Sequence, residues 1–299
     1  MTESLESLQR SFNRALRVEG KADRTLVIYG QSVRYLARWL VENDQRADLD
    51  NLTRENVLAW FESLRGRGLT DGTIKTRWRG LRRFTGWLVA EGIVDKDPLV
   101  GIKVKNPVPP PVPVLDDADL KKLIAACKGT HFRDRRDMAM VRLLLDCGLR
   151  VSELTGITLD DLDLDAETVV VTGKGSRVRA AYFGAKTGQA LDRYLRERSK
   201  HRHASLGALF LGERGPFSTD GVRERLQVRA QMAGIDGRMN PHRFRHTNAH
   251  DFLLAGGQER DLKRLMGWRS DAMLDRYGAS GADIRARESV KRLRRGDRV

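Results

Sequence analysis

The chain has 299 residues, a formal net charge of +15 at pH 7 and a sequence pI of about 10.2. This basic balance favours a polyanionic partner, and nucleic acid is the usual one, although ribosomal and membrane-surface proteins can be as basic. The length suits two domains, and the mean hydropathy of -0.49 without a long apolar run excludes a membrane-spanning protein.

The N-terminus and the two cysteines indicate an intracellular protein. Residues 1–6 lack the positive region and apolar core of a signal peptide, so we expect a cytoplasmic protein associated with the nucleoid and with no membrane. Cys127 and Cys147 lie in segments with the apolar spacing of amphipathic helices, and we expect buried reduced thiols, not a disulfide.

Apolar residues recur every three or four positions before residue 90 and predict helices over 24–41, about 54–65 and 70–88. One face of the third helix is basic, and no acid lies between Asp71 and Glu91. A solvated surface is the alternative, but unbalanced guanidinium groups repel one another, which favours contact with DNA. The expected DNA-binding residues are Lys75, Arg77, Arg79, Arg82 and Arg83. We therefore predict a helical DNA-binding domain over 1–103.

A proline-rich stretch divides the sequence. Five of the eight prolines lie within residues 103–113. Proline fixes φ and lacks an amide proton, so such a stretch is extended and semi-rigid. We expect an interdomain linker over 104–115, followed by a second domain over 116–299.

The second domain is predicted to be mostly helical. Its only convincing β region is 160–183, where strands over 167–172 and 178–183 flank a Gly-Lys-Gly turn. Helices are expected over 116–126, 134–147, 187–200, 218–232, 241–255, 259–266, 271–277 and 282–295. The predicted fold class is mainly α (α+β), with a helical first domain and a helical second domain that holds a small antiparallel sheet.

The second domain also carries residues suited to phosphodiester chemistry. Cleavage by a side-chain hydroxyl requires a nucleophile, cations around the non-bridging oxygens and a proton donor for the leaving group. A metal ion can replace the cations, but the acids of residues 160–165 alternate as on an exposed loop and strand edge. We expect no metal site and no cofactor.

Five motifs with these residue types follow one another along the second domain. They are Gly148-Leu149-Arg150-Val151-Ser152-Glu153-Leu154, Lys174 between two glycines, Pro241-His242-Arg243-Phe244-Arg245-His246, Leu265-Met266-Gly267-Trp268, and Tyr277 nine residues after Trp268. In these motifs the chain resembles the tyrosine recombinase (phage integrase) family. The first domain resembles the helical, SAM-like core-binding domain of that family, so the resemblance covers essentially the whole chain.

The resemblance implies a catalytic role for each matched residue. Arg150 and Arg245 would clamp the scissile phosphate, for which guanidinium is suited because it stays charged and donates two parallel hydrogen bonds. Lys174 would protonate the leaving 5′-oxygen, and His242 would accept the proton of the nucleophile, Tyr277. An ion pair with Glu153 is the alternative role for Arg150, and the two roles are compatible because Glu153 would orient neighbouring groups.

Other positions have weaker assignments. Trp268 stands where most members of the family carry histidine, and an indole donates a hydrogen bond but cannot act as a base. The spacing of His242 and His246 also suits zinc, yet the usual glutamate between such histidines is missing, so His246 is expected to be a supporting residue. Arg177 and Arg179 compete with Lys174 on the same hairpin, although the two flanking glycines favour Lys174, and Arg177 is expected to contact DNA.

The function implied is site-specific DNA recombination through a 3′-phosphotyrosine intermediate. Family members act as homotetramers on double-stranded DNA attachment sites, and we expect a monomer or weak oligomer in the free state. A host or phage DNA-bending or directionality factor is a further expected partner. In the C-terminal segment, apolar residues would dock on a neighbouring subunit or basic residues would touch DNA. The apolar residues are Ile284, Val290 and Leu293, and the basic ones are Lys291, Arg292, Arg294 and Arg295.

The biological role has several readings. Trp268 favours a compact integrase of a phage or mobile element, because Xer proteins usually keep histidine at this position. The alternatives are a Xer-like chromosome or plasmid dimer resolvase, a type IB topoisomerase, and a DNA-binding regulator without catalysis.

Overall fold

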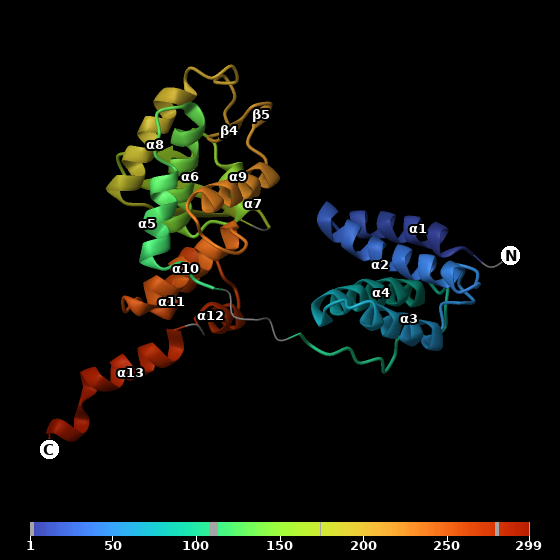
Figure 1. Cartoon of the computed structure of the whole chain (residues 1–299). Helices are drawn as coiled ribbons and strands as arrows, with labels where there is room; N and C mark the ends of the chain where they lie inside the picture. The colour runs from blue at the N-terminus through green and yellow to red at the C-terminus, as the bar shows by residue number, and fades with distance from the viewer. Residues whose placement is uncertain (1–2, 108–112, 174, 279–280, 299) are drawn as a thin grey trace. The chain divides into compact units, whose positions relative to one another are not determined.

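The structure is a computed structural model, and it describes residues 3–107, 113–173, 175–278 and 281–298 (Figure 1). The chain divides into two compact units, Met1–Pro109 and Pro110–Val299. This division falls in the proline-rich stretch for which an extended linker is expected, and residues 108–112 of that stretch lie outside the described residues. Among the described residues, no helix is long and apolar enough to cross a lipid bilayer.

The first unit is a bundle of α1 (Leu5–Val18), α2 (Asp23–Glu42), α3 (Arg54–Gly66) and α4 (Asp71–Ala90). Side chains at the N-caps of three helices accept a hydrogen bond from the third helical amide, which fixes where each helix begins; they are Ser4, Thr53 and Thr70. The prediction from sequence omitted α1, whose buried residues Leu5, Leu8, Phe12 and Leu16 belong to the core of the unit.

The second unit is built mainly from helices around one hydrophobic core. Its helices are α5 (Asp117–Ala126), α6 (Phe132–Cys147), α7 (Val151–Gly156), α8 (Ala185–Arg198), α9 (Thr219–Met232), α10 (Pro241–Leu254), α11 (Glu259–Met266), α12 (Asp271–Gly278) and α13 (Ala282–Leu293), with a 3-10 turn over Arg295–Arg298. Helix α7 was not predicted from the sequence. The mainly helical fold class is confirmed.

Two small antiparallel sheets accompany these helices. The strands β1 (Leu162–Asp163), β2 (Thr168–Gly173) and β3 (Arg177–Tyr182) lie in the order β1-β2-β3, and Gly173 pairs with Arg177 at the end of the β2-β3 ladder. The strands β4 (Leu211–Gly212) and β5 (Gly215–Pro216) form a two-stranded ladder that was not predicted.

Both cysteines are buried free thiols, as expected. Burial raises the pKa of the Cys127 thiol to about 12. Burial likewise raises the pKa of the Cys147 thiol, which donates a hydrogen bond to the carbonyl of Tyr182. Both groups are therefore protonated at neutral pH and act as small apolar core residues.

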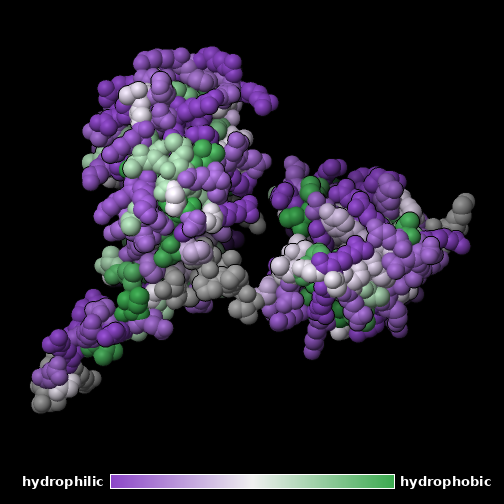
Figure 2. Space-filling view, viewed as in Figure 1, coloured by the Kyte–Doolittle hydropathy of each residue, from purple (hydrophilic) through white to green (hydrophobic). Residues whose placement is uncertain are grey.

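A separate hydrophobic cluster joins α10, α11 and α12. Its buried members are Ala249, Leu253, Leu262, Met266, Trp268 and Tyr277. This cluster is much smaller than the main core of the unit, so α12 rests on few buried apolar contacts. Beyond α12, no residue of α13 is buried, and apolar side chains of this helix stand at the surface (Figure 2, lower left).

Candidate active site

The turn between α6 and α7 places Arg150. Gly148 ends α6 with a left-handed φ of +55°, and a Cβ there would lie 2.8 Å from Cε of Met266. Arg150 is the N-cap of α7: its backbone N–H donates to Oε2 of Glu153 at 2.9 Å, and its Nη1 donates to Oε1 at 2.6 Å. Both polar ends of Arg150 are thus fixed by one buried carboxylate.

Glu153 also holds a second arginine. Nη2 of Arg179, on β3, donates to Oε2 of Glu153 at 3.0 Å. Burial alone would raise the pKa of Glu153, but the hydrogen bond from the Arg150 amide and the charges of Arg179 and Arg150 outweigh it, so the pKa lies below its ordinary value. Glu153 is therefore ionised at neutral pH and ties α7 to β3.

The start of α10 sets the positions of two histidines and an arginine. The side chain of Asn240 accepts hydrogen bonds from the amides of His242 and Arg243, and Pro241 occupies the first turn. With this start, His242 is exposed in the first turn, while Arg245 and His246 are buried one turn later. Sequence analysis assigned His242 and Arg245 to one phosphate site, and the helix places both beside Tyr277.

The guanidinium of Arg245 is bound to backbone carbonyls. Nη1 donates to the oxygen of Gly148 at 2.7 Å and Nη2 to the oxygen of Met266, and the side chain is only 1% exposed. Burial and the nearby positive charge of Arg150 together lower the pKa of Arg245 to about 10, and the charge of Glu153 opposes this shift. Arg245 therefore remains charged at neutral pH and joins α10 to the ends of α6 and α11.

Tyr277 packs against aromatic rings of its own chain. Its ring stacks on His246 with centroids 3.9 Å apart and planes 18° from parallel, and it leans on Trp268 with centroids 4.6 Å apart. The hydroxyl lies 3.4 Å from Nε2 of His242, within hydrogen-bond distance. Tyr277 is 1% exposed, so the hydroxyl is shielded from solvent in this conformation.

A cleft of about 710 Å³ lies beside this group. Arg150, Arg179 and Trp268 line it, and Glu153 is its only acidic lining residue among those that the structure describes. Two buried donors here, Nη1 of Arg179 and Nε1 of Trp268, have no hydrogen-bond partner within the described part of the chain. Because unpaired buried donors are costly, the cleft suits an anionic ligand that supplies acceptor oxygens.

Arg179 is a site residue that sequence analysis weighed only as a rival of Lys174 and did not select. The alternation of β3 places Arg177 and Arg179 on one face of the strand, and this is the signal that the sequence offered. Arg177 is exposed and lines the same cleft. Lys174, the expected general acid, lies outside the described residues, between the end of β2 and Gly175.

The five basic residues expected to bind DNA lie on α4 of the first unit. Arg83 forms an ion pair at 2.5 Å with Glu19, the C-cap residue of α1, so an acid far away in the sequence balances its charge. Lys75 and Arg82 lie over the ring of Trp78, and Arg77 lies over the ring of Tyr35. Within the described residues, neither these three nor Arg79 forms an ion pair.

Sequence comparisons identify the family of the chain. Residues 113–282 match the phage integrase family, and residues 10–92 match the phage integrase N-terminal SAM-like domain. The chain is 30% identical to tyrosine recombinase XerC of Corynebacterium efficiens, over 90% of this chain and 85% of the relative. It is 32% identical to tyrosine recombinase XerC of Neisseria meningitidis serogroup B, over 93% of each chain.

Solved structures share the fold. The Tn1549 transposon integrase in complex with transposon right end DNA is 21% identical, covers 98% of this chain and 99% of its own, and has a TM-score of 0.75. A lambda integrase tetramer bound to a Holliday junction is 17% identical, covers 92% of this chain and 77% of its own, and has a TM-score of 0.72. The chain belongs to the phage integrase family and is a tyrosine recombinase, an enzyme that cleaves and rejoins DNA strands.

Proposed function

We propose that this enzyme is a Xer-type recombinase that resolves chromosome or plasmid dimers at simple sites. Relatives named tyrosine recombinase XerC match it along 85–94% of their own length, which supports this role over the phage or mobile-element integrase favoured by sequence analysis. The observation that best supports the chemistry is the position of the Tyr277 hydroxyl. It lies 3.4 Å from Nε2 of His242 and beside Arg245 of the same chain.

The residues of the site have complementary roles in this proposal. Tyr277 attacks the scissile phosphate, forming a bond to the 3′-phosphate as the 5′-oxygen leaves, and His242 takes the phenol proton. Arg150 and Arg245 stabilise the charge on the non-bridging oxygens. Lys174 protonates the leaving oxygen. The reverse steps, with a 5′-hydroxyl from a partner duplex, rejoin the strand.

A conformational step precedes attack. Arg245 and Tyr277 are each 1% exposed, and the arginine donates to two backbone carbonyls, so no phosphate reaches either group in this conformation. Helix α12 rests on a small apolar cluster, which makes its release the least costly way to expose both groups. Binding of DNA drives this opening, and Tyr277 then attacks a phosphate held by its own subunit.

The partners are double-stranded DNA sites and further copies of the chain, arranged as a homotetramer during strand exchange. Ile284, Val290 and Leu293 of α13 are all more than half exposed, as expected of a helix that docks on a neighbouring subunit. Their exposure also suits a monomer in the free state. A DNA-bending accessory protein of the host completes the assembly, and the enzyme acts in the cytoplasm at the nucleoid.

A second candidate is a compact integrase of a phage or mobile element. Trp268 favours it, because the family resemblance leads us to expect histidine at this position in Xer proteins. The two roles differ in their DNA sites: a resolvase recombines two identical sites, whereas an integrase joins two different ones and leaves hybrid products.

The chemistry is tested on DNA sites selected by the enzyme itself. Duplexes retained from a random-sequence pool are rebuilt with a nick near the cleavage point, so that the covalent complex accumulates. We expect Tyr277→Phe to bind these duplexes like the parent enzyme and to form no covalent complex. If the mutant still cleaves the duplexes, Tyr277 is not the nucleophile. If the parent enzyme binds the duplexes without cleaving them, the result favours a DNA-binding regulator.

The biological role is tested with plasmids. A plasmid with two directly repeated copies of the selected site should be converted into two circles by a resolvase. If the plasmid is not resolved but the enzyme recombines two unlike sites, the enzyme is an integrase instead. Relaxation of supercoiled plasmids that lack any selected site would indicate a type IB topoisomerase.

A further inference from the structure

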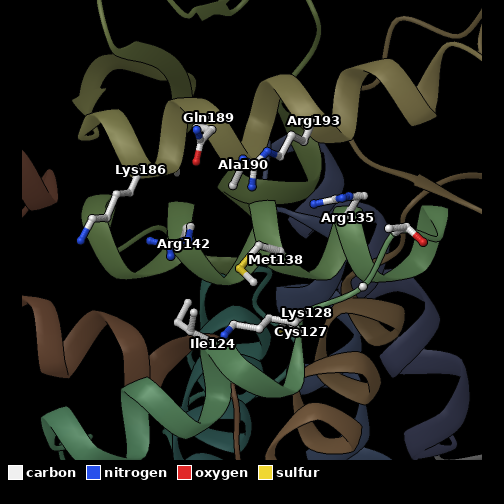
Figure 3. A pocket seen from close by; sticks show the side chains of 12 residues that line it. Ile124, Cys127, Lys128, Arg135, Met138, Arg142, Lys186, Gln189, Ala190 and Arg193 are labelled. Carbon is white, nitrogen blue, oxygen red and sulfur yellow. The ribbon is translucent and has the colours of Figure 1, made fainter.

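A basic groove lies between α5, α6 and α8, away from the active-site cleft. It encloses about 580 Å³ (Figure 3). Five cationic residues line it: Lys128 just after α5, Arg135 and Arg142 on α6, and Lys186 and Arg193 on α8. None of them lines the cleft beside Tyr277.

Within the described residues, no ion pair balances the charge of this groove. No acidic residue lines it in the described part of the chain, and none of its five cations forms an ion pair there. Nearby acids form ion pairs with cations outside the groove: Asp192 with Arg196, Glu197 with Lys200, and Asp134 with Arg229. Of these acids, Glu197 also feels the charge of Arg135 without forming an ion pair with it. Like charges held this close repel one another, so the groove favours an anionic ligand.

Four of the five cations lie in two groups along the groove. The amide of Gly184, just before α8, donates to Asp146 near the end of α6, and the ring of Tyr194 lies near that of Phe132 at the start of α6. The helices are therefore antiparallel, which places Lys186 near Arg142 and Arg193 near Arg135. Seven residues at 1.5 Å per residue separate the two groups by about 10 Å.

The floor of the groove limits the choice of ligand. Met138 lies between Arg135 and Arg142, and Ile124 and Ala190 complete a small apolar surface (Figure 3). No aromatic ring lines the groove among the described residues, so it lacks the stacking surface that holds unpaired bases. A ligand with regularly spaced anionic groups and no exposed base fits this lining best.

We propose that the groove binds the phosphate backbone of duplex DNA, at phosphates separate from the one that Tyr277 attacks. The enzyme acts on DNA, and Arg and Lys without acid partners are typical of surfaces that contact phosphates. Along α6, Arg135 lies about 20 Å before Gly148, at which the turn to Arg150 begins. A duplex that reached both the groove and the active-site cleft would contact the second unit over a greater length than the cleft alone provides. This inference rests on the action of the enzyme on DNA, not on the choice between resolvase and integrase.

The test compares two double variants with equal loss of charge. Arg142→Gln with Arg193→Gln removes one cation from each end of the groove. Lys121→Gln with Arg196→Gln removes two exposed cations from α5 and α8 outside it. Binding of the full-length enzymes to a 40-base-pair duplex of arbitrary sequence is measured by fluorescence anisotropy across a salt series, and thermal melting checks that both variants fold. Arbitrary sequence suffices because phosphate contacts are sequence-independent.

We expect the groove variant to bind roughly tenfold more weakly than the control at 50 mM salt, with a log–log salt slope shallower by about two. Equal affinity and slope in the two variants would overturn the proposal. Parent enzyme that binds no duplex would instead contradict the action on DNA. Binding of inorganic triphosphate and of a poly-glutamate peptide is measured with the same two variants. If the groove variant binds duplex DNA as the control does but no longer binds triphosphate, the groove is a site for a free polyphosphate. If it no longer binds the peptide instead, the groove is a site for an acidic protein, and either result overturns the DNA assignment.

Discussion

The ring of Tyr277 lies flat on the ring of His246, with centroids 3.9 Å apart and planes 18° from parallel. His246 belongs to α10, which also carries Arg245, whereas Tyr277 belongs to α12. The contact therefore couples the position of Tyr277, the proposed nucleophile, to the helix that carries Arg245, the proposed phosphate ligand. It is also one of the buried contacts that hold α12 against α10 in this structure.

Replacing His246 should loosen α12. An aromatic pair contributes about 0.5–1.5 kcal/mol beyond its buried area, so His246→Ala should speed amide hydrogen exchange in α12 roughly fivefold. His246→Phe keeps a ring beneath Tyr277 and should exchange like the parent enzyme. Peptides from α5 serve as an internal control in the same mass-spectrometric measurement. If α12 exchanges at the parental rate in His246→Ala, the stack does not hold the helix.

Trp268 should contribute a hydrogen bond as well as packing. Its buried Nε1 has no partner within the described residues, and a bound phosphate oxygen would supply one. Trp268→Phe keeps most of the packing and should lower the rate of covalent-complex formation on nicked duplexes on the order of a hundredfold, the effect of removing one oxyanion donor. Trp268→His restores a donor and should lose much less. Parental cleavage by Trp268→Phe would leave the indole a packing role only.

Sequence spacing predicted most of the helices, and short motifs indicated the family, because both signals are local. The mainly helical class and the tyrosine recombinase assignment are confirmed, whereas the catalytic roles of the individual residues stay predictions. Ion pairs between distant segments could not be predicted from the sequence. The pairs of Arg83 with Glu19 and of Arg179 with Glu153 are two examples. Helix α1 was missed although Leu5, Leu8 and Phe12 carry a helical period.

Burial was the other property that the sequence did not reveal. Motif order grouped Tyr277 with Arg245, yet it gave no sign that both side chains would be shielded by packing among α10, α11 and α12. Burial depends on how short helices pack against one another, and this is set by tertiary contacts. The same holds for Arg135 and Arg142, whose common groove requires α8 as its opposite wall.

Glu153 should make the second unit sensitive to acid. Its pKa is lower in the folded state than in the unfolded chain, so its stabilising contribution is fully present above the ordinary carboxyl pKa and is lost as pH falls through the lowered value. Glu153→Gln leaves Arg150 and Arg179 facing each other and should cost on the order of 2 kcal/mol at pH 7, less than a fully buried pair because Arg150 is partly exposed. Urea unfolding at pH 7 and at pH 3.5 should show the difference shrinking at the lower pH. A difference that is independent of pH would mean that the charge of Glu153 contributes nothing.

Gly148 should tolerate no side chain, because it sets the turn that carries Arg150. Its φ of +55° strains any L-residue, and an added Cβ would lie 2.8 Å from Cε of Met266 and 3.3 Å from Oδ1 of Asn248. Gly148→Ala should therefore destabilise the protein by about 1–3 kcal/mol and lower cleavage more than DNA binding, since the displaced turn carries Arg150 away from Arg245. Gly156→Ala, at the end of α7, is the matched control: no atom lies within 4 Å of its added Cβ, and both melting and cleavage should stay close to parental. Thermal melting with covalent-complex yields separates the two, and equal behaviour of both variants would show that the α6–α7 turn does not set the geometry of the site.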